Sequence, residues 1–397
     1  MSLFFTRPRE TRDVTMQDWI RGTDLGGAKT KAGVVVTPDK ALKVDAMWAS
    51  VHLLASTVAN LPVDVFRGSG TSKAPVSPLP AFIVRPSLIL EDRQDWTYQA
   101  MVSLLLRGNA YGMILGRGPG DLPSAVEWLN PDDVTVEQKS SLRAPTYKIK
   151  QDEVPARELI HLRAFLKPGS AVGLSPVAYK AETLGISLAA RDYGAGFYGE
   201  GGHPTAIFMN KGQQQLDPDQ VKTIKDRFLA VVRGKREPLV VGSDWAYTPL
   251  QVSPSEADFV SSMGYSDAQI ARMYGPGVAE VLGYQTTGSS LTYTNRVDRS
   301  LDLLTYTVDP WITKFNNFWT RSIPRPQTAR INVNALLRAD PKTRHEIFQI
   351  DRNIGLYSID ELRALEDQPP TPDGSGGDYT PLALKGGTTG GQANGGN

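Results

Sequence analysis

The chain has 397 residues, with 43 basic and 42 acidic side chains and a formal net charge of +1. This length predicts two or three folded domains. The balanced charge argues against tight binding to nucleic acid without regard to sequence, which needs a clear cationic excess. The lack of cysteine excludes disulfides and thiolate metal sites. No run approaches the ~20 apolar residues of a membrane span, so we expect a soluble protein, made in a reducing cytoplasm, without a cofactor.

The first 40 residues read as a flexible N-terminal arm, and the pattern that follows predicts a helix and then a strand. One apolar helical face is formed by residues three or four positions apart, namely Met47, Val51, Leu54, Val58 and Leu61. Pro62 ends the helix, and "VDVF" alternates as a strand.

A second helix is predicted from Asp95 to Arg107. Short strands follow it, in "YGMILGR", "AVEWLN", "VTVEQ", "TYKIK" and "LIHLRAF", with turns such as "GRGPGD" and "NPDD" between them. The pattern indicates a small domain of helices and antiparallel strands that ends near Lys167.

Three central helices are each predicted to begin at a polar residue followed by proline, at Ser175, Asp217 and Ser253. Proline suits the first helical position because its missing N–H needs no partner there, and the polar side chain caps the free N–H groups. Strands "TAIFM" and "LVVGS…AYTPL" lie between these helices, which gives the order helix, strand, helix, strand, helix.

A long helix of about thirty residues is predicted from Val297, because its apolar residues recur at steps of three and four. These residues are Val297, Leu301, Leu304, Val308, Ile312, Phe315 and Trp319. Pro310 is expected to kink the helix. A strand at "ARINVNALL" follows, then a helix opened by Asp340-Pro341 and a short one capped by Ser358 and Glu361. The glycine-rich residues after 368 are expected to be disordered.

No motif in the chain predicts catalysis or metal binding. "GRGPG" lacks the Lys-Ser/Thr pair of a phosphate loop, and "GLSPV" lacks the second glycine of a nucleophile elbow, so Ser175 is interpreted as a helix cap. Asp132 and Asp133 follow Pro131 in a turn, and His161 reads as a half-buried structural histidine.

Two stretches remain as candidate functional surfaces. The first is a basic cluster, interpreted either as a solvated helix face or as a docking surface for an acidic partner. It consists of Lys222, Lys225, Arg227, Arg233, Lys235 and Arg236. The second is a polar, uncharged loop at the head of the long helix, which could also be an ordinary surface loop. It consists of Gln285, Thr286, Thr287, Gly288, Ser289 and Ser290.

From about residue 40 to 370 the chain resembles the portal, or head-to-tail connector, proteins of long-tailed bacteriophages. The matching stretches occur in the family's order, and they are "AMWASVHLLASTVANLPVDVF", "LLLRGNAYGMI", "LNPDDVTV", "GLSPVAYKAETLGISLAARDYGAGFYGEGGHPTAIF" and "YSDAQIARMYGPGVAEVLG". A polar "TYTN" and a long helix with an internal "DP" complete the series. One departure is the lack of the proline that usually follows "GV" in this family.

The resemblance implies an α+β portal-type fold that assembles as a ring, usually of twelve subunits. Its parts are a helix-and-strand wing, paired stem helices, a strand–helix–strand clip, a tunnel loop, a long kinked helix and a small helical crown. The implied boundaries are 1–40 for the arm, 41–172 for the first part of the wing, 173–204 and 253–281 for the stem helices, 205–252 for the clip, 282–295 for the tunnel loop, 296–338 for the long helix with a returning wing strand, 339–368 for the crown and 369–397 for the disordered tail.

By this resemblance the chain is a structural conduit without catalysis, at one vertex of the capsid, assembled in the host cytoplasm. Its implied partners are other copies of itself, double-stranded DNA passing without sequence specificity, the terminase packaging motor, the major capsid protein and a head–tail adaptor, with no membrane. The polar loop would face the DNA, where hydroxyls and amides hold phosphates less firmly than lysine or arginine. The basic cluster would dock partners. The alternatives are an enzyme that processes nucleic acid, or another head–tail adaptor component.

Overall fold

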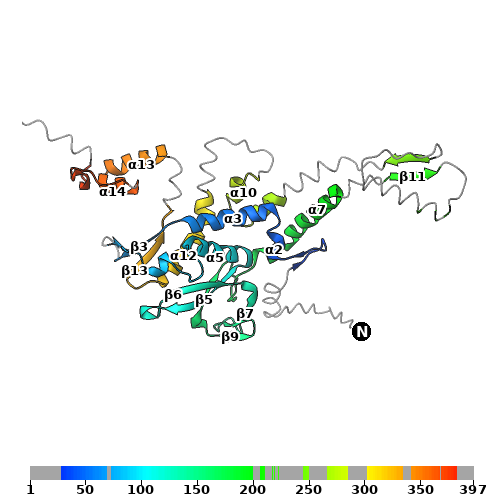
Figure 1. The fold of residues 1–397 in the computed structure, drawn as a ribbon, viewed down its shortest axis with the longest axis horizontal. Helices are drawn as coiled ribbons and strands as arrows, with labels where there is room; N and C mark the ends of the chain where they lie inside the picture. The colour runs from blue at the N-terminus through cyan, green and yellow to red at the C-terminus, as the bar shows by residue number, and fades with distance from the viewer. Residues whose placement is uncertain are drawn as a thin grey trace, which may run out of the picture. The chain divides into compact units, whose positions relative to one another are not determined.

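The computed structural model describes residues 28–68, 73–199, 206–210, 217, 219, 222, 245–249, 266–284, 302–333, 341–366 and 368–381. The chain divides into two units. Unit 1 comprises residues 1–60 and 64–330, and unit 2 comprises residues 61–63 and 331–397. Figure 1 shows the ribbon of the chain, with many of its elements labelled.

Two helices form the centre of unit 1, α3 (Asp45–Asn60) and α5 (Arg93–Arg107), which pack against each other. The predicted apolar face of α3 is buried, including Met47, Leu54 and Val58. The helix α5 begins two residues earlier than predicted and ends at Gly108, whose φ of 71° is a left-handed conformation that glycine adopts without strain.

A three-stranded antiparallel sheet in the order β10-β5-β6 adjoins α5. Its strands are β5 (Asn109–Arg117), β6 (Pro123–Leu129) and β10 (Leu159–Arg163). The hairpin between β5 and β6 turns at "GRGPGD", as predicted, through the 3-10 helix η2 (Pro119–Asp121). The hydrophobic residues of these strands thereby share a core with α5.

A second sheet in the order β7-β8-β9 is built from β7 (Val134–Glu137), β8 (Thr146–Ile149) and β9 (Asp152–Val154). It is flanked by the 3-10 helices η3 (Pro131–Asp133) and η4 (Ala156–Glu158). Val134, Val136 and Tyr147 join Tyr111 and Leu159 of the first sheet in one apolar cluster. The strand β9 was not predicted, because the sequence "DEV" has no apolar alternation to reveal it.

The long helix is described from residue 302, as a π-helical segment η5 (Leu303–Val308) followed by α12 (Asp309–Arg321). Pro310 lies at the join, where its lack of an N–H removes the usual hydrogen bond to the carbonyl of Tyr306. The extra residue of the π turn changes the predicted face: Leu303 is buried, whereas Leu304 is only partly buried. From Val308 onward the predicted positions are buried.

The helix predicted at Ser175 begins there. Ser175 Oγ accepts a hydrogen bond from the N–H of Ala178, and the helix is divided at Lys180 into α6 (Pro176–Tyr179) and α7 (Ala181–Gly199). Asp217 is described, but most of the helix predicted after it lies outside the described residues. The start predicted at Ser253 lies wholly outside them. The later segment is described as a helix at residues 266–272 and as α10 (Val278–Val281).

The remaining described elements of the chain before unit 2 are short. An antiparallel pair joins β11 (Ala206–Asn210) to β12 (Trp245–Pro249), at two stretches where strands were predicted. Another sheet has the order β13-β3-β4, from β13 (Gln327–Ile331), β3 (Val63–Arg67) and β4 (Ala74–Pro75). The others are β1 (Ala28–Lys29), β2 (Val35–Val36), α2 (Pro38–Ala41) and α4 (Ala81–Val84).

Unit 2 contains α13 (Pro341–Asn353), α14 (Ile359–Leu365) and the 3-10 helix η7 (Ser375–Gly377). The capping box predicted at Ser358 and Glu361 is present. The prediction of disorder from residue 369 is wrong for residues 369–381. Side chains of α14 hold this stretch, since Asp360 accepts from the N–H of Thr371 at 2.7 Å and Glu361 accepts from the hydroxyl of Tyr379 at 2.6 Å. Polar side chains thus order a segment that buries little apolar surface.

Candidate channel and docking surfaces

The candidate tunnel loop, Gln285–Ser290, lies outside the described residues. Its neighbours in sequence are described up to Tyr284 and again from Asp302. The structure therefore gives the surroundings of the two ends.

The segment before the loop contacts the segment after it through a turn at Gly275, Pro276 and Gly277, which packs on η5. Thr307 Oγ1 donates to the carbonyl of Pro276 at 2.7 Å. Gly277 has a φ of 83°, and a Cβ there would lie 2.7 Å from the backbone nitrogen of Leu303. Only glycine allows this approach. The "GPG" motif therefore brings the two flanks of the loop into contact.

Tyr274 fixes the same turn to the centre of unit 1. Its hydroxyl donates to the carbonyl of Leu105 in α5 at 2.9 Å and contacts the sulfur of Met47 in α3. Full burial raises the pKa of Tyr274 well above its usual range, so the phenol stays protonated and keeps this hydrogen bond.

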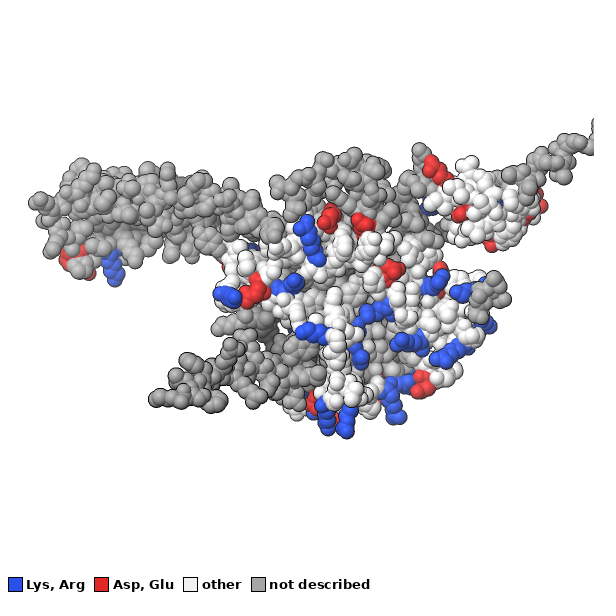
Figure 2. All heavy atoms as spheres, turned by 180° about the vertical axis from the view of Figure 1, so that it is seen from behind, with Lys and Arg blue, Asp and Glu red and all other residues white. Residues whose placement is uncertain are grey.

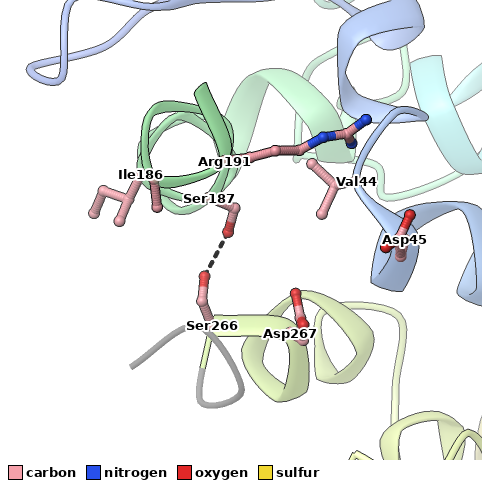
Figure 3. Close-up of a pocket in the computed structure, with 8 residues that line it drawn as sticks. Val44, Asp45, Ile186, Ser187, Arg191, Ser266 and Asp267 are labelled. Atoms are coloured by element: carbon pink, nitrogen blue, oxygen red, sulfur yellow. Dashed lines mark hydrogen bonds between the residues drawn. The ribbon is translucent and has the colours of Figure 1, made fainter. Parts of the chain in front are cut away.

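A small cleft opens where the helix at 266–272 passes α7 and the start of α3 (Figure 3). Its volume is about 90 Å³, and the hydroxyls of Ser187 and Ser266 are hydrogen-bonded at 2.6 Å across it. Asp267 lies in the cleft with Asp45, and its pKa is raised first by burial and then by the charge of Asp45. A cleft of this size holds a few water molecules, not a nucleotide.

The candidate basic cluster is described only at Lys222, which is helical and exposed. Lys225, Arg227, Arg233, Lys235 and Arg236 lie outside the described residues. On the face drawn in Figure 2, basic side chains are spread over the described surface with acidic ones among them, rather than gathered in one stripe.

Ser175, Asp132 and His161 have structural partners that agree with their non-catalytic interpretation. Ser175 Oγ donates to the carbonyl of Leu106 at 2.8 Å, and Asp132 accepts from Arg107 at 2.5 Å. His161 Nε2 is 2.9 Å from Asn109 Oδ1, and its Nδ1 is 3.0 Å from Arg163 Nε. Burial, and then the charge of Arg163, lowers the pKa of His161 to about 3.

Sequence reasoning missed Asn109, which organises this region. Its Oδ1 accepts from the N–H of Gly173 at 2.8 Å, and its Nδ2 donates to the carbonyl of Gly173 at 2.9 Å. The signal was an asparagine that directly follows the helix-ending Gly108. It fixes the loop at residues 164–175 to the junction of α5 and β5 across 64 positions of sequence.

Among the described residues, no group of three or more His, Cys, Asp or Glu side chains is placed to hold a metal ion. None of the helices described is both long and apolar enough to cross a bilayer.

The comparisons with known proteins identify the family. The phage portal protein family matches residues 45–367, so the chain belongs to that family. A probable portal protein of Streptomyces phage phiC31 is 28% identical over 90% of this chain and 82% of its own length. The portal protein of Enterobacteria phage HK97 is 25% identical over 85% of this chain and 82% of its own length.

Solved structures show the same fold. A phage portal protein of the HK97 family from Corynebacterium diphtheriae aligns with 78% of this chain and all of its own, with a TM-score of 0.58 and 17% identity. A chain in the neck of a native gene transfer agent particle, computed with C12 symmetry, aligns with 91% of this chain and 95% of its own, with a TM-score of 0.54 and 19% identity. The chain is thus a portal protein in sequence family and in fold.

Proposed function

We propose that twelve copies of this chain form the ring at the unique capsid vertex, through which double-stranded DNA is packaged and ejected, and that the ring joins head to tail. The observation that carries the proposal is the family match over residues 45–367, supported by the fold shared with a gene transfer agent neck. In this role the protein is part of the virion and has no catalysis of its own. Terminase, the major capsid protein and a head–tail adaptor are its proposed partners.

The domain assignment is part of the proposal. Residues 41–172 form the first part of the wing, α6, α7 and the helix at 266–272 belong to the stem, the β11–β12 pair belongs to the clip, and α13 and α14 form the crown. The contact of the "GPG" turn with η5 supports a tunnel loop at 282–295, because it brings the two flanks of that segment together.

The test is the size and symmetry of the purified full-length chain. Each subunit is 43.3 kDa, so a twelve-subunit ring is about half a megadalton. Mass photometry and electron-microscopy class averages down the axis are expected to show closed rings with a central opening. A nucleic-acid enzyme would run as a small oligomer. If the purified chain shows nothing larger than a dimer at micromolar concentration, the proposal is overturned.

The polar loop and the basic cluster are proposed to have separate roles. The loop residues from Gln285 to Ser290 face the DNA, and lysine at Thr286, Thr287 and Ser289 is expected to slow packaging, most at low salt. The cluster from Lys222 to Arg236 docks an acidic partner, and charge reversal at Arg233, Lys235 and Arg236 is expected to weaken docking with rings intact. A triple-lysine variant that packages at the normal rate in low salt would remove the loop from the DNA path.

A further inference from the structure

A short loop before α5 displays two aliphatic side chains to solvent. Leu88 is 64% exposed and Ile89 is 76% exposed, and exposed Val84 of α4 belongs to the same stretch. We call Val84, Leu88 and Ile89 the leading patch. Apolar side chains at these exposures gain little from the folding of the isolated subunit.

Hydrogen bonds to Glu127 and Ser87 hold the loop that carries Leu88 and Ile89. Glu127 of β6 accepts from the N–H of Leu88 at 2.6 Å and from Ser87 Oγ at 2.8 Å. Ser87 Oγ in turn accepts from the N–H of Leu90 at 2.7 Å. Hydrogen bonds to a carboxylate are among the stronger ones in proteins. The loop is therefore fixed before it meets any partner, which lowers the entropy cost of binding.

A second rigid loop displays apolar groups after β10. Phe165 and Leu166 of this loop are exposed, Leu166 at 55%, and so is Tyr179, the last residue of α6. We call Phe165, Leu166 and Tyr179 the trailing patch. Phe165 has a φ of 52°, a strained conformation for a bulky residue that costs on the order of 1–3 kcal/mol. The ring of Phe165 packs edge-on against Trp311 at 5.8 Å, and Leu166 pairs with Gly173 in an isolated bridge.

The two patches lie at opposite ends of one rigid helix, α5. The leading patch ends at Ile89, four residues before Arg93, the first residue of α5. The loop that carries most of the trailing patch is bound to the carboxyl end, since Ala164 N–H donates to the carbonyl of Gly108 and Ser175 Oγ donates to that of Leu106. A helix of fifteen residues spans about 22 Å. The helix α12 repeats this arrangement, with Trp311 beside Phe165 and Trp319 beside Phe82 of α4.

The charges beside the two patches are complementary. The leading patch is followed by three exposed carboxylates, Glu91, Asp92 and Asp95. Arg85 is exposed and Arg93 is half-buried there, and the three carboxylates outnumber the two arginines. The trailing patch is flanked by exposed Lys167 and Lys180, and Lys167 Nζ donates to the hydroxyl of Tyr179 at 2.7 Å. Opposite charges at the rim of an apolar contact favour the correct partner and orientation.

We infer that the leading patch of one copy of this chain packs against the trailing patch of the next copy, as a head-to-tail contact. The inference rests on the proposed ring. A closed ring requires two different, mutually complementary surfaces on each subunit, and the described part of unit 1 presents two with matched apolar content and opposite charge. A contact between identical patches would instead place like charges opposite each other.

The experiment compares ring assembly of full-length variants by mass photometry over a concentration series. Ile89→Glu and Leu166→Glu each place a carboxylate at the centre of one patch. Each is expected to raise the concentration at half-assembly at least ~tenfold, since a buried unpaired charge is strongly unfavourable. Leu142→Glu, on the exposed turn between β7 and β8 and outside both patches, is the matched control and leaves assembly unchanged. Thermal melting of the monomers checks that all three fold.

Mixing the two patch variants tests the head-to-tail geometry. Each variant keeps one intact patch, so an equimolar mixture can form one good contact and is expected to give heterodimers that do not grow into rings. If Ile89→Glu blocks assembly while Leu166→Glu does not, the leading patch has another partner and the inference is wrong. If both variants assemble as the wild type does, the contact is elsewhere, although the ring stands. A wild-type chain that forms no ring overturns the proposed function itself.

Discussion

The two ends of α5 are held to their surroundings in different ways. Aromatic rings pack in the core at its amino end, whereas a network of hydrogen bonds joins its carboxyl end to β10 and the loop that follows β10. Trp96 is fully buried and packs against Phe318 at 5.7 Å and Trp319 at 5.2 Å between ring centroids. At the other end, Asn109 joins His161 of β10 to Gly173 of the following loop. Each arrangement lies beside a loop that displays apolar side chains.

The two ends should respond differently to change. Aromatic packing depends on volume and is insensitive to pH, because none of these rings titrates in the accessible range. A buried polar network depends on every member having its partner, because an orphaned donor or acceptor pays its full desolvation cost. In this portal subunit, stability at the amino end of α5 should therefore fall when a buried side chain is shortened. Stability at the carboxyl end should fall when the pH is lowered.

The largest effect is expected at the aromatic end, from Trp96→Ala. The substitution removes a large buried ring. It also removes the indole N–H that donates to the carbonyl of Val126 at 2.7 Å. Truncation of a buried tryptophan costs about 3–5 kcal/mol. We expect a large fall in melting temperature that is the same at pH 5 and pH 8.

The control for that prediction is Trp96→Phe, which keeps most of the apolar volume and loses only the hydrogen bond. Trp96→Phe should therefore lose less than half of the stability that Trp96→Ala loses. A Trp96→Ala protein that melts within two or three degrees of the wild type, by a cooperative transition, would show that the cluster is not a core.

At the polar end we expect acid to destabilise the fold through His161. Its pKa is lowered from 6.5 to about 3, so the folded chain keeps it neutral while the unfolded chain binds a proton below about pH 6.5. Its contribution is therefore complete above pH 6.5 and is lost as the pH falls toward 3, by on the order of 4 kcal/mol. Burial is the main cause of the lowered pKa of His161, and the charge of Arg163, whose Nε lies 3.0 Å from Nδ1, adds to it.

The measurement is the difference in unfolding free energy between wild type and His161→Gln, followed from pH 8 to pH 4. Glutamine carries a donor and an acceptor but does not titrate. The variant should be less stable at pH 8 and lose less stability on acidification. Parallel curves for the two proteins would mean that carboxylates elsewhere account for the acid sensitivity.

Features set by neighbouring residues were more predictable from sequence than contacts between distant residues. The three-and-four spacing of α3 and the caps at Ser175 and Ser358 are local signals, and each was confirmed. Phe315 and Trp319 of α12 were assigned to one apolar face, but the buried residues Trp311 and Phe318 were not. The contacts of Phe318 and Trp319 with Trp96 depend on packing across more than 200 residues. Asn109 and Gly173 carry no periodicity, and the π turn before Pro310 moved the buried face from Leu304 to Leu303.

The smallest effect is expected from Ser175→Ala, which separates a buried cap from an exposed one. Ser175 is buried, and its hydroxyl both accepts from Ala178 N–H and donates to the carbonyl of Leu106. Alanine leaves both groups unpaired inside the fold, at a cost of about 1–2 kcal/mol. Thr37 caps α2 in the same way through Lys40 N–H at 3.2 Å, but water can replace its hydroxyl, so Thr37→Ala should cost less, about 0.5 kcal/mol. Melting curves of the two variants give the comparison. Equal losses would mean that Ser175 stabilises the fold only by capping α6, and that its hydrogen bond to α5 adds nothing.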